Sequence, residues 1–184
     1  MSTEFHLTLS DGEKRALKDL VRLSIASALA GRETPIPEAP TELLTRELGA
    51  FVTLTLAGQL RGCIGNVLGS GPLWRTVWSM ARAAAFEDPR FPPLTLREFE
   101  AVHVEISILG PVEPCPDPER IIVGRHGLIV SRGGRQGLLL PQVPVEWGWN
   151  REQFISQTCR KAGLPESAWQ HPETRIFWFE AEVF

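Results

Sequence analysis

Two neighbouring runs of strand-forming residues constrain the fold more than any other part of the sequence. The first run, FVTLTL at 51–56, is rich in β-branched and aliphatic residues, and the second is LRGCIG at 60–65. Only AGQ at 57–59 separates them, which leaves room for a tight turn. The two runs therefore predict an antiparallel hairpin.

The turn also predicts how the two strands are paired. Gly58 suits the first central position of a type II′ turn, with Gln59 as the second. Leu54 is then expected opposite Cys63.

Cys63 is the residue of this hairpin with the greatest capacity to react. Side chains alternate along a strand, so Arg61, Cys63 and Gly65 are expected on one face, with successive members roughly 6.6 Å apart. At that distance Arg61 favours the thiolate form of Cys63. Gly62 and Gly65 indicate close approach of a ligand or of another backbone. The pattern predicts a reactive thiol with ligand-binding positions at Arg61, Gly62 and Gly65.

A second interpretation of Cys63 is structural. In the expected register its face also carries Val52, Leu54 and Leu56. Free cysteine is among the most buried residue types, and a thiol packed in such a layer is inert. Both interpretations stay open at this stage.

The remaining periodic segments predict an α+β or mixed α/β fold, with an antiparallel or mixed sheet and packed helices. A capping box, Ser10 to Glu13, begins the first expected helix. The expected helices are 11–29, 72–85 and 151–162, and the expected strands are 102–109, 128–131, 137–140 and 174–184. A chain of 184 residues suits one compact domain over 1–184, with a larger and a smaller lobe and a short tail at 1–9.

Three polar residues alternate with apolar ones in the expected strand 102–109. His103, Glu105 and Ser107 fall on one face, which is typical of the solvated side of an antiparallel sheet. Alternatively the stripe lines a cleft, with Glu105 as a proton acceptor and Ser107 as a ligand contact.

His126 and Gln142 are candidates at the ends of expected strands. His126 stands in a turn, and a histidine near neutral pH is the usual proton acceptor for a catalytic cysteine such as Cys63. A turn histidine that makes one backbone hydrogen bond is the commoner case. Gln142 offers an amide donor and acceptor where an apolar strand ends.

The pair Asp88 and Arg90 has a structural and a functional interpretation. The two side chains can pair with each other or with a backbone carbonyl. Alternatively Arg90 binds an anion beside Arg61, because planar guanidinium groups bind carboxylate or phosphate bidentately. Trp147 and Trp149 are expected to pack, with a platform for a flat ligand or a partner as the alternative.

Composition excludes several classes of protein. The net charge of −3 opposes a general attraction to nucleic acid. No stretch approaches the roughly 20 apolar residues that span a bilayer, and residues 1–7 lack a signal-peptide pattern. The sequence therefore predicts a cytoplasmic protein with no membrane partner. Phosphate-loop and dinucleotide motifs are missing, and the scattered histidines and cysteines have no metal-ligand spacing, so neither a cofactor nor a metal is expected.

Several short blocks, in order along the chain, carry a family resemblance. They are GAFVTL at 49–54, LRGCIG at 60–65, DPRF at 88–91, EISIL at 105–109, HGL at 126–128, LLPQV at 139–143 and CRKAGL at 159–164. Together they resemble the AMMECR family from about Asp11 to the C-terminus. The resemblance implies a two-subdomain α/β fold with a cleft near LRGCIG.

The resemblance also bears on residues and partners. It favours Glu105 and Ser107, which lie within a matched block. Prokaryotic members resemble component A of the AmmeMemoRadiSam system, in which this domain occurs with a Memo-type protein and a radical-SAM protein.

Two functional hypotheses result. The first is a cytosolic enzyme or enzyme subunit that binds a small anionic or peptide-like ligand near Arg61, Arg90 and Glu105, with Cys63 as nucleophile. The second is a non-catalytic scaffold for Memo-type and radical-SAM partners.

Overall fold

The computed structural model describes residues 8–184, which form two compact units. The N-terminal unit comprises residues 8–109 and 182–184, and the C-terminal unit comprises residues 110–181. Helices and antiparallel strands occur in both, so the predicted α+β class is confirmed. Residues 1–7 lie outside the described residues. They are the residues predicted to lack a signal-peptide pattern, and they make up most of the expected tail at 1–9. Leu9 is not part of a loose tail, because it is buried and its amide donates to Glu182 at 2.8 Å.

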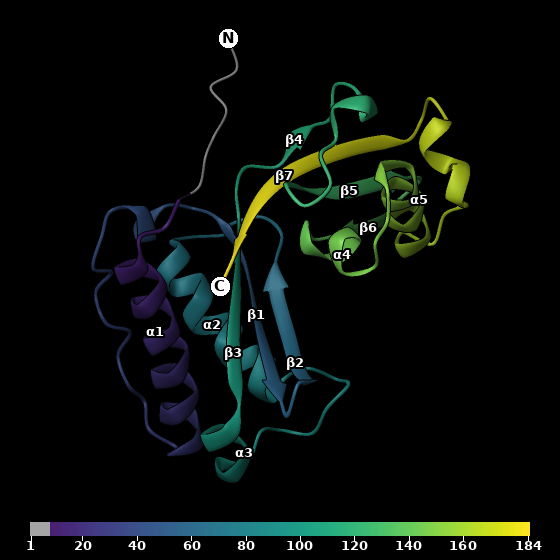
Figure 1. The fold of residues 1–184 in the computed structure, drawn as a ribbon. Helices are drawn as coiled ribbons and strands as arrows, with labels where there is room; N and C mark the ends of the chain where they lie inside the picture. Colours follow the sequence, from purple (N-terminus) through teal and green to yellow (C-terminus); the bar gives the residue numbers. More distant parts are fainter. Residues whose placement is uncertain (1–7) are drawn as a thin grey trace. The chain divides into compact units, whose positions relative to one another are not determined.

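The N-terminal unit contains antiparallel strands together with helices (Figure 1). Its elements are α1 (Asp11–Leu29), the 3₁₀ turn η1 (Leu43–Thr45), β1 (Gly49–Leu56), β2 (Gln59–Asn66), α2 (Leu73–Phe86), α3 (Leu96–Ala101) and β3 (His103–Leu109). The strand order is β2-β1-β3, and β2 therefore forms an edge. The last residue of the chain, Phe184, exchanges two backbone hydrogen bonds with Ile106 on β3.

Local capping signals place α1 where the sequence predicts it. The Ser10 hydroxyl accepts from the Glu13 amide while the Glu13 carboxylate accepts from the Ser10 amide, so the capping box is formed. The Thr41 hydroxyl also donates to Glu13 at 2.6 Å, and these hydrogen bonds lower the pKa of the Glu13 carboxyl. The helix is thereby tied to the loop that follows it.

The helices α1 and α2 cover one face of the sheet (Figure 1). Apolar side chains on that face, such as Val52, Leu54 and Ile106, are fully buried. Gly62 lies opposite Leu54 on this face, and a Cβ atom there would come within 2.0 Å of the Ala84 carbonyl oxygen on α2. A glycine at position 62 is therefore what lets α2 approach β2 so closely.

The hairpin β1–β2 forms as predicted, but its predicted register is wrong by one residue. Cys63 pairs with Thr53, not with Leu54. The reason is the turn: Ala57 and Gly58 both have positive φ, of 51° and 77°, which is the type I′ arrangement. On its own this turn would place Cys63 opposite Val52, and the bulge next to Leu54 moves the pairing back by one residue, to Thr53.

The C-terminal unit contains antiparallel strands in the order β4-β7-β5-β6. Its elements are β4 (Glu113–Pro114), η2 (Pro118–Arg120), β5 (His126–Arg132), β6 (Arg135–Leu139), α4 (Gln142–Glu146), α5 (Arg151–Lys161), η3 (Glu166–Gln170) and β7 (Arg175–Val183), whose last two residues belong to the N-terminal unit. The predicted β5–β6 hairpin is confirmed, with Gly133 and Gly134 at positive φ in its turn. Neither α4 nor β4 is predicted from the sequence.

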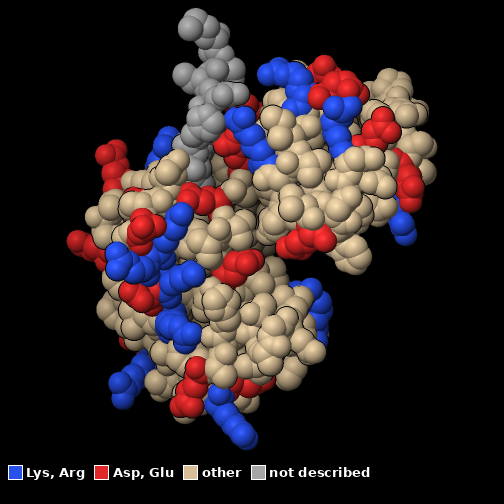
Figure 2. Space-filling model, in the orientation of Figure 1, with Lys and Arg blue, Asp and Glu red and all other residues tan. Residues whose placement is uncertain are grey.

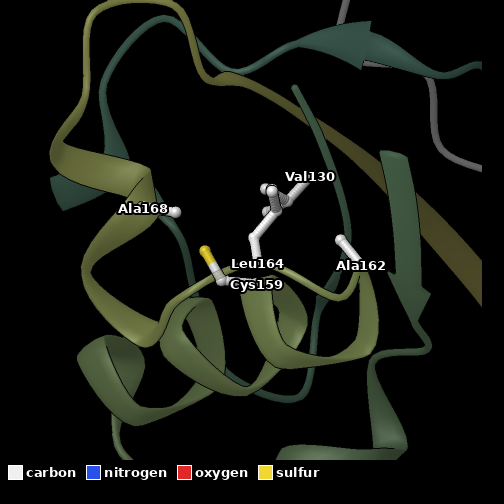
Figure 3. Packing of buried hydrophobic residues seen from close by; sticks show 5 residues of the cluster. All are labelled: Val130, Cys159, Ala162, Leu164 and Ala168. Atoms are coloured by element: carbon white, nitrogen blue, oxygen red, sulfur yellow. The ribbon is translucent and has the colours of Figure 1, made fainter. Parts of the chain in front are cut away.

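Cys159 is part of the core of the C-terminal unit, as its helical position predicts. Figure 3 shows its side chain among Val130, Ala162, Leu164 and Ala168. The residue has no exposed surface, and burial raises the pKa of its thiol. This thiol is a packing group.

Residues 8–184 contain neither a membrane-spanning helix nor a cluster of metal-ligating side chains. No helix in this range has both the length and the apolar character needed to cross a membrane. Over the same range, no three His, Cys, Asp or Glu side chains are grouped so that they could hold a metal ion.

The contact at Gly62 predicts the effect of a single methyl group. Gly62→Ala should lower the free energy of unfolding by about 2 kcal/mol, because the new Cβ forces α2 away from the sheet. Chemical denaturation monitored by circular dichroism measures this change.

Gly12→Ala is the matched control, because the nearest atom to a Cβ there is 3.9 Å away. Gly12 lies in the first turn of α1, where alanine should raise the stability by up to about 1 kcal/mol. Equal effects of the two substitutions would contradict the packing argument.

Candidate functional site

Cys63 lies at the edge-strand end of a polar row that crosses the three strands of the N-terminal unit. Thr53 on β1 is directly opposite Cys63 on β2 and also directly opposite Glu105 on β3. The neighbouring row, Gly62–Leu54–Val104, belongs to the helix-covered face, so the Cys63 row lies on the other face.

The sulfur of Cys63 contacts a polar group. The Thr53 hydroxyl donates to Sγ at 3.3 Å, and the Cys63 side chain is partly exposed. The backbones of Cys63 and Glu105 are two strand spacings apart, roughly 10 Å, with Thr53 between them. The apolar layer of Val52, Leu54 and Leu56 that sequence analysis placed around this thiol does not surround it, because the register differs.

Asp88 and Arg90 hold the backbone of Cys63 at the sheet edge. The Cys63 amide donates to Asp88 Oδ2 at 2.9 Å, and Arg90 Nη2 donates to the Cys63 carbonyl at 3.3 Å. The two side chains also pair with each other, at 2.9 Å to Oδ1 and 2.7 Å to Oδ2. At this one residue they occupy the place of a neighbouring strand and satisfy the outward-facing amide and carbonyl of β2.

The charges of this pair are strongly coupled. Asp88 is almost fully buried, and its hydrogen bond from the Arg90 guanidinium holds the pKa of its carboxyl well below the usual range. The same hydrogen bond raises the pKa of Arg90. The Arg90 side chain is 53% exposed, so the cation faces solvent while the carboxylate does not. Asp88 and Arg90 therefore pair with each other, as the structural interpretation predicts.

Arg61 binds a carboxylate instead of stabilising the Cys63 thiolate as expected. Its Nε and Nη2 atoms donate to the two oxygens of Glu98 on α3, at 2.9 and 3.1 Å, and it lies beside the ring of Phe91. The bulge next to Leu54 disturbs the side-chain alternation on which the expectation rested. The cation next to Cys63 is Arg90.

Glu98 is a partner that sequence analysis missed. The hydrogen bond from Arg61 lowers the pKa of the Glu98 carboxyl to about 2, assisted by the amide and hydroxyl of Thr95. A signal was present, because Thr95 and Glu98 form a capping box that begins α3.

The face of the sheet that carries the Cys63 row, opposite the helices α1 and α2, is called the open face. The remaining predicted residues of this face lie close to that row. Phe51 is opposite both Gly65 and Ser107, and its ring occupies the space next to Gly65 where a Cβ would otherwise lie. Ser107 is buried. Gly62 and Gly65 thus accommodate parts of the protein itself.

His126 and Gln142 belong to the C-terminal unit. His126 is buried at the start of β5, not in a flexible turn, and its Nδ1 accepts from the Ile122 amide at 3.1 Å. Gln142 begins helix α4 and does not end a strand, and within the described residues its buried Oε1 has no hydrogen-bond partner. A catalytic arrangement of His126 with Cys63 stays a prediction.

The expectation that Trp147 packs is wrong. Trp147 is 69% exposed, although its ring stacks on that of Trp149 with 5.9 Å between centroids. Val145, which precedes it on α4, is 58% exposed. On the face of the molecule drawn in Figure 2, acidic and basic side chains are interspersed.

Comparison with known proteins identifies consistent relatives. The AMMECR1 family model matches residues 18–184. A protein of Aquifex aeolicus is 44% identical over 177 residues, covering 92% of this chain and 91% of its own length. A protein of Nanoarchaeum equitans is 43% identical over 175 residues, covering 91% and 97%.

A solved structure is also similar. The crystal structure of an uncharacterized protein from Pyrococcus horikoshii superposes with a TM-score of 0.87 at 41% identity. The match covers 95% of this chain and 92% of that one. The likeness extends over nearly the whole chain, so both units belong to the shared fold.

The Asp88 contacts predict a pH-dependent loss of stability. Asp88→Asn should lower the free energy of unfolding by about 2 kcal/mol at pH 7, because hydrogen bonds to a charged group are lost. An unfolded aspartate titrates near about 3.9, and the folded pKa lies below that value. The carboxylate's contribution is therefore complete above about pH 5 and is lost as the pH falls further. Urea denaturation from pH 7 to pH 2.5 should show the gap between wild type and variant narrowing.

Glu87→Gln is the control, because Glu87 is exposed and adjacent to this pair in sequence. It should change stability little at any pH. A gap for Asp88→Asn that stays constant down to pH 2.5 would refute the assigned ion pair.

Proposed function

The chain belongs to the AMMECR1 family, and we propose that Cys63 is a reactive thiol at a ligand-binding site on the open face of the N-terminal unit. The observation that carries this proposal is the Thr53 hydroxyl, which donates to the Cys63 sulfur at 3.3 Å. A hydroxyl that donates to sulfur orients it and stabilises negative charge on it. Glu105, the carboxylate of the same row, lies two strand spacings from Cys63 with Thr53 between them, so it does not take up the thiol proton directly.

Arg90 gives the site its preference for an anionic or peptide-like ligand. Its side chain is half exposed, and its Nε and Nη2 atoms bind Asp88 and the Cys63 carbonyl. Within the described residues Nη1 makes no hydrogen bond, so two N–H groups remain for a ligand carboxylate or carbonyl. Because Asp88 fixes the guanidinium, little side-chain entropy is lost on binding.

Alkylation tests the thiol directly. Native protein treated with iodoacetamide at pH 7 should be labelled at Cys63 about tenfold faster than at Cys115 or Cys159, since burial raises the pKa of both other thiols. Peptide mass spectrometry measures the three rates in one sample.

Thr53→Val should slow the labelling of Cys63, because the hydrogen bond to sulfur is lost. Thr55→Val is the matched control, since Thr55 lies two residues along the same strand and pairs with Leu60 instead. If Cys63 reacts no faster than Cys159, the site is not a reactive one.

A second candidate function is docking of protein partners, and the exposure of Trp147 and Val145 supports it. Large apolar side chains in contact with solvent are typical of interaction surfaces. The partners proposed are a Memo-type and a radical-SAM protein, as the family resemblance implies.

Co-expression with those two partners tests the docking function. Trp147→Ala should reduce the recovered complex at least tenfold, whereas Cys63→Ser should leave it unchanged. Leu68→Ala controls for loss of an exposed apolar side chain elsewhere, because Leu68 is 67% exposed in the N-terminal unit. Absence of a complex with the wild-type chain would exclude these partners.

A further inference from the structure

The C-terminal unit contains a hollow that the Cys63 site does not use. Its volume is about 870 Å³, which is within the size range of small-molecule sites. Residues that line it include Glu113, Arg120, Ile122, His126, Trp178 and Glu180. All of them lie in residues 110–181.

Three adjacent strands form the floor of the hollow. Glu113 on β4 is directly opposite Trp178 on β7, and His126 on β5 is directly opposite Glu180 on β7. Because Trp178 and Glu180 are two residues apart on one strand, these four side chains share a face. The His126 and Trp178 rings touch, with 4.5 Å between their centroids.

Arg120 reaches over this floor from the connection that follows β4. Its guanidinium carbon lies 5.6 Å from the centroid of the Trp178 ring, which is a cation–π contact. Asp117 caps the short turn η2 that carries Arg120, and Pro118 begins that turn. The walls are therefore stiff, since Pro111, Pro114 and Pro116 also line the hollow.

Among residues 8–184, Arg120 and Glu113 are opposite charges at the hollow that make no ion pair. Arg125 is paired with Glu180 at 2.6 Å, and Glu119 is paired with Arg151. By contrast, the described part of the chain gives neither Arg120 nor Glu113 an ion pair. Both flank Trp178, one above its ring and one beside it on the neighbouring strand.

We propose that this hollow binds a small zwitterion of the amino-acid type. The ligand carboxylate binds Arg120, the ligand ammonium binds Glu113, and the apolar side chain lies against Trp178 and Ile122. A simple anion would be repelled by Glu113, and a simple cation by Arg120. Only a ligand with both charges satisfies the two residues together, and walls that are already formed lower the entropy cost of binding.

Titration calorimetry on the full chain tests the proposal with four related probes. L-phenylalanine carries both charges, N-acetyl-L-phenylalanine lacks the ammonium, L-phenylalanine amide lacks the carboxylate, and N-acetyl-L-phenylalanine amide lacks both. L-phenylalanine should bind at least tenfold more tightly than each of the others, because each charge-assisted hydrogen bond contributes a factor of about ten or more.

Charge-removing variants should change this ranking in opposite ways. Glu113→Gln should abolish the preference for the free ammonium, and Arg120→Gln should abolish the preference for the free carboxylate. Both residues are exposed, so the variants should fold, and thermal unfolding checks this. Glu146→Gln and Arg160→Gln are the matched controls within the same unit, and neither should alter the ranking.

Three results would overturn the proposal. One is no binding of L-phenylalanine up to 10 mM. Another is equal binding of all four probes. The third is a preference for L-phenylalanine that survives both Glu113→Gln and Arg120→Gln. Cys63→Ser should leave binding unchanged, so this site and the thiol site fail or succeed separately.

Discussion

The close approach of α2 to β2 at Gly62 determines the organisation of the N-terminal unit. A backbone carbonyl on α2 occupies the position that a side chain would take, so that face of the sheet can only be the core. Since neighbouring residues on a strand point to opposite sides, Cys63 must point away from the helices. One steric constraint thus separates a packed face from a face that carries Cys63, Thr53 and Glu105.

The elements that sequence analysis located are those specified by local chemistry. The capping residues Ser10 and Asn150 begin helices whose starts agree with prediction, and Gly133–Gly134 forms the expected turn. These signals act within a few residues, so they are readable without knowledge of the fold. The short helix α4, with only five residues and a proline inside it, has too few periodic positions to be recognised.

The register of β1 and β2 shows where local chemistry is insufficient. Alanine at position 57 adopts a positive φ that L-residues rarely take. The type I′ turn could therefore not be recognised from its residue types. A shift of one residue transfers a side chain to the other face. Because of this error, aliphatic residues were predicted as the neighbours of Cys63, whereas the structure has Thr53 opposite it. The hairpin itself was predicted correctly.

The partners of charged side chains were the least predictable part of the site. Arg61 is satisfied by a carboxylate 37 residues away, and the Cys63 amide by one 25 residues away. Sequence analysis identified Arg61 and Asp88 but missed Glu98, and it could not assign these pairs, because loop conformation decides which carboxylate lies next to each group. The structural interpretation of Asp88 and Arg90 was pairing with each other or with a backbone carbonyl, and Arg90 does both.

Cys63 and Cys159 differ in a way that follows from these contacts. Cys159 is enclosed by aliphatic side chains, whereas Cys63 is fixed through its backbone and is only half-buried. A functional group is most effective when its support comes from groups other than those that react. Asp88 and Arg90 provide that support, since they bind the amide and the carbonyl, and Thr53 is the residue that contacts the sulfur. The rigidity of the site and the partial exposure of Cys63 therefore come from different interactions and do not compete.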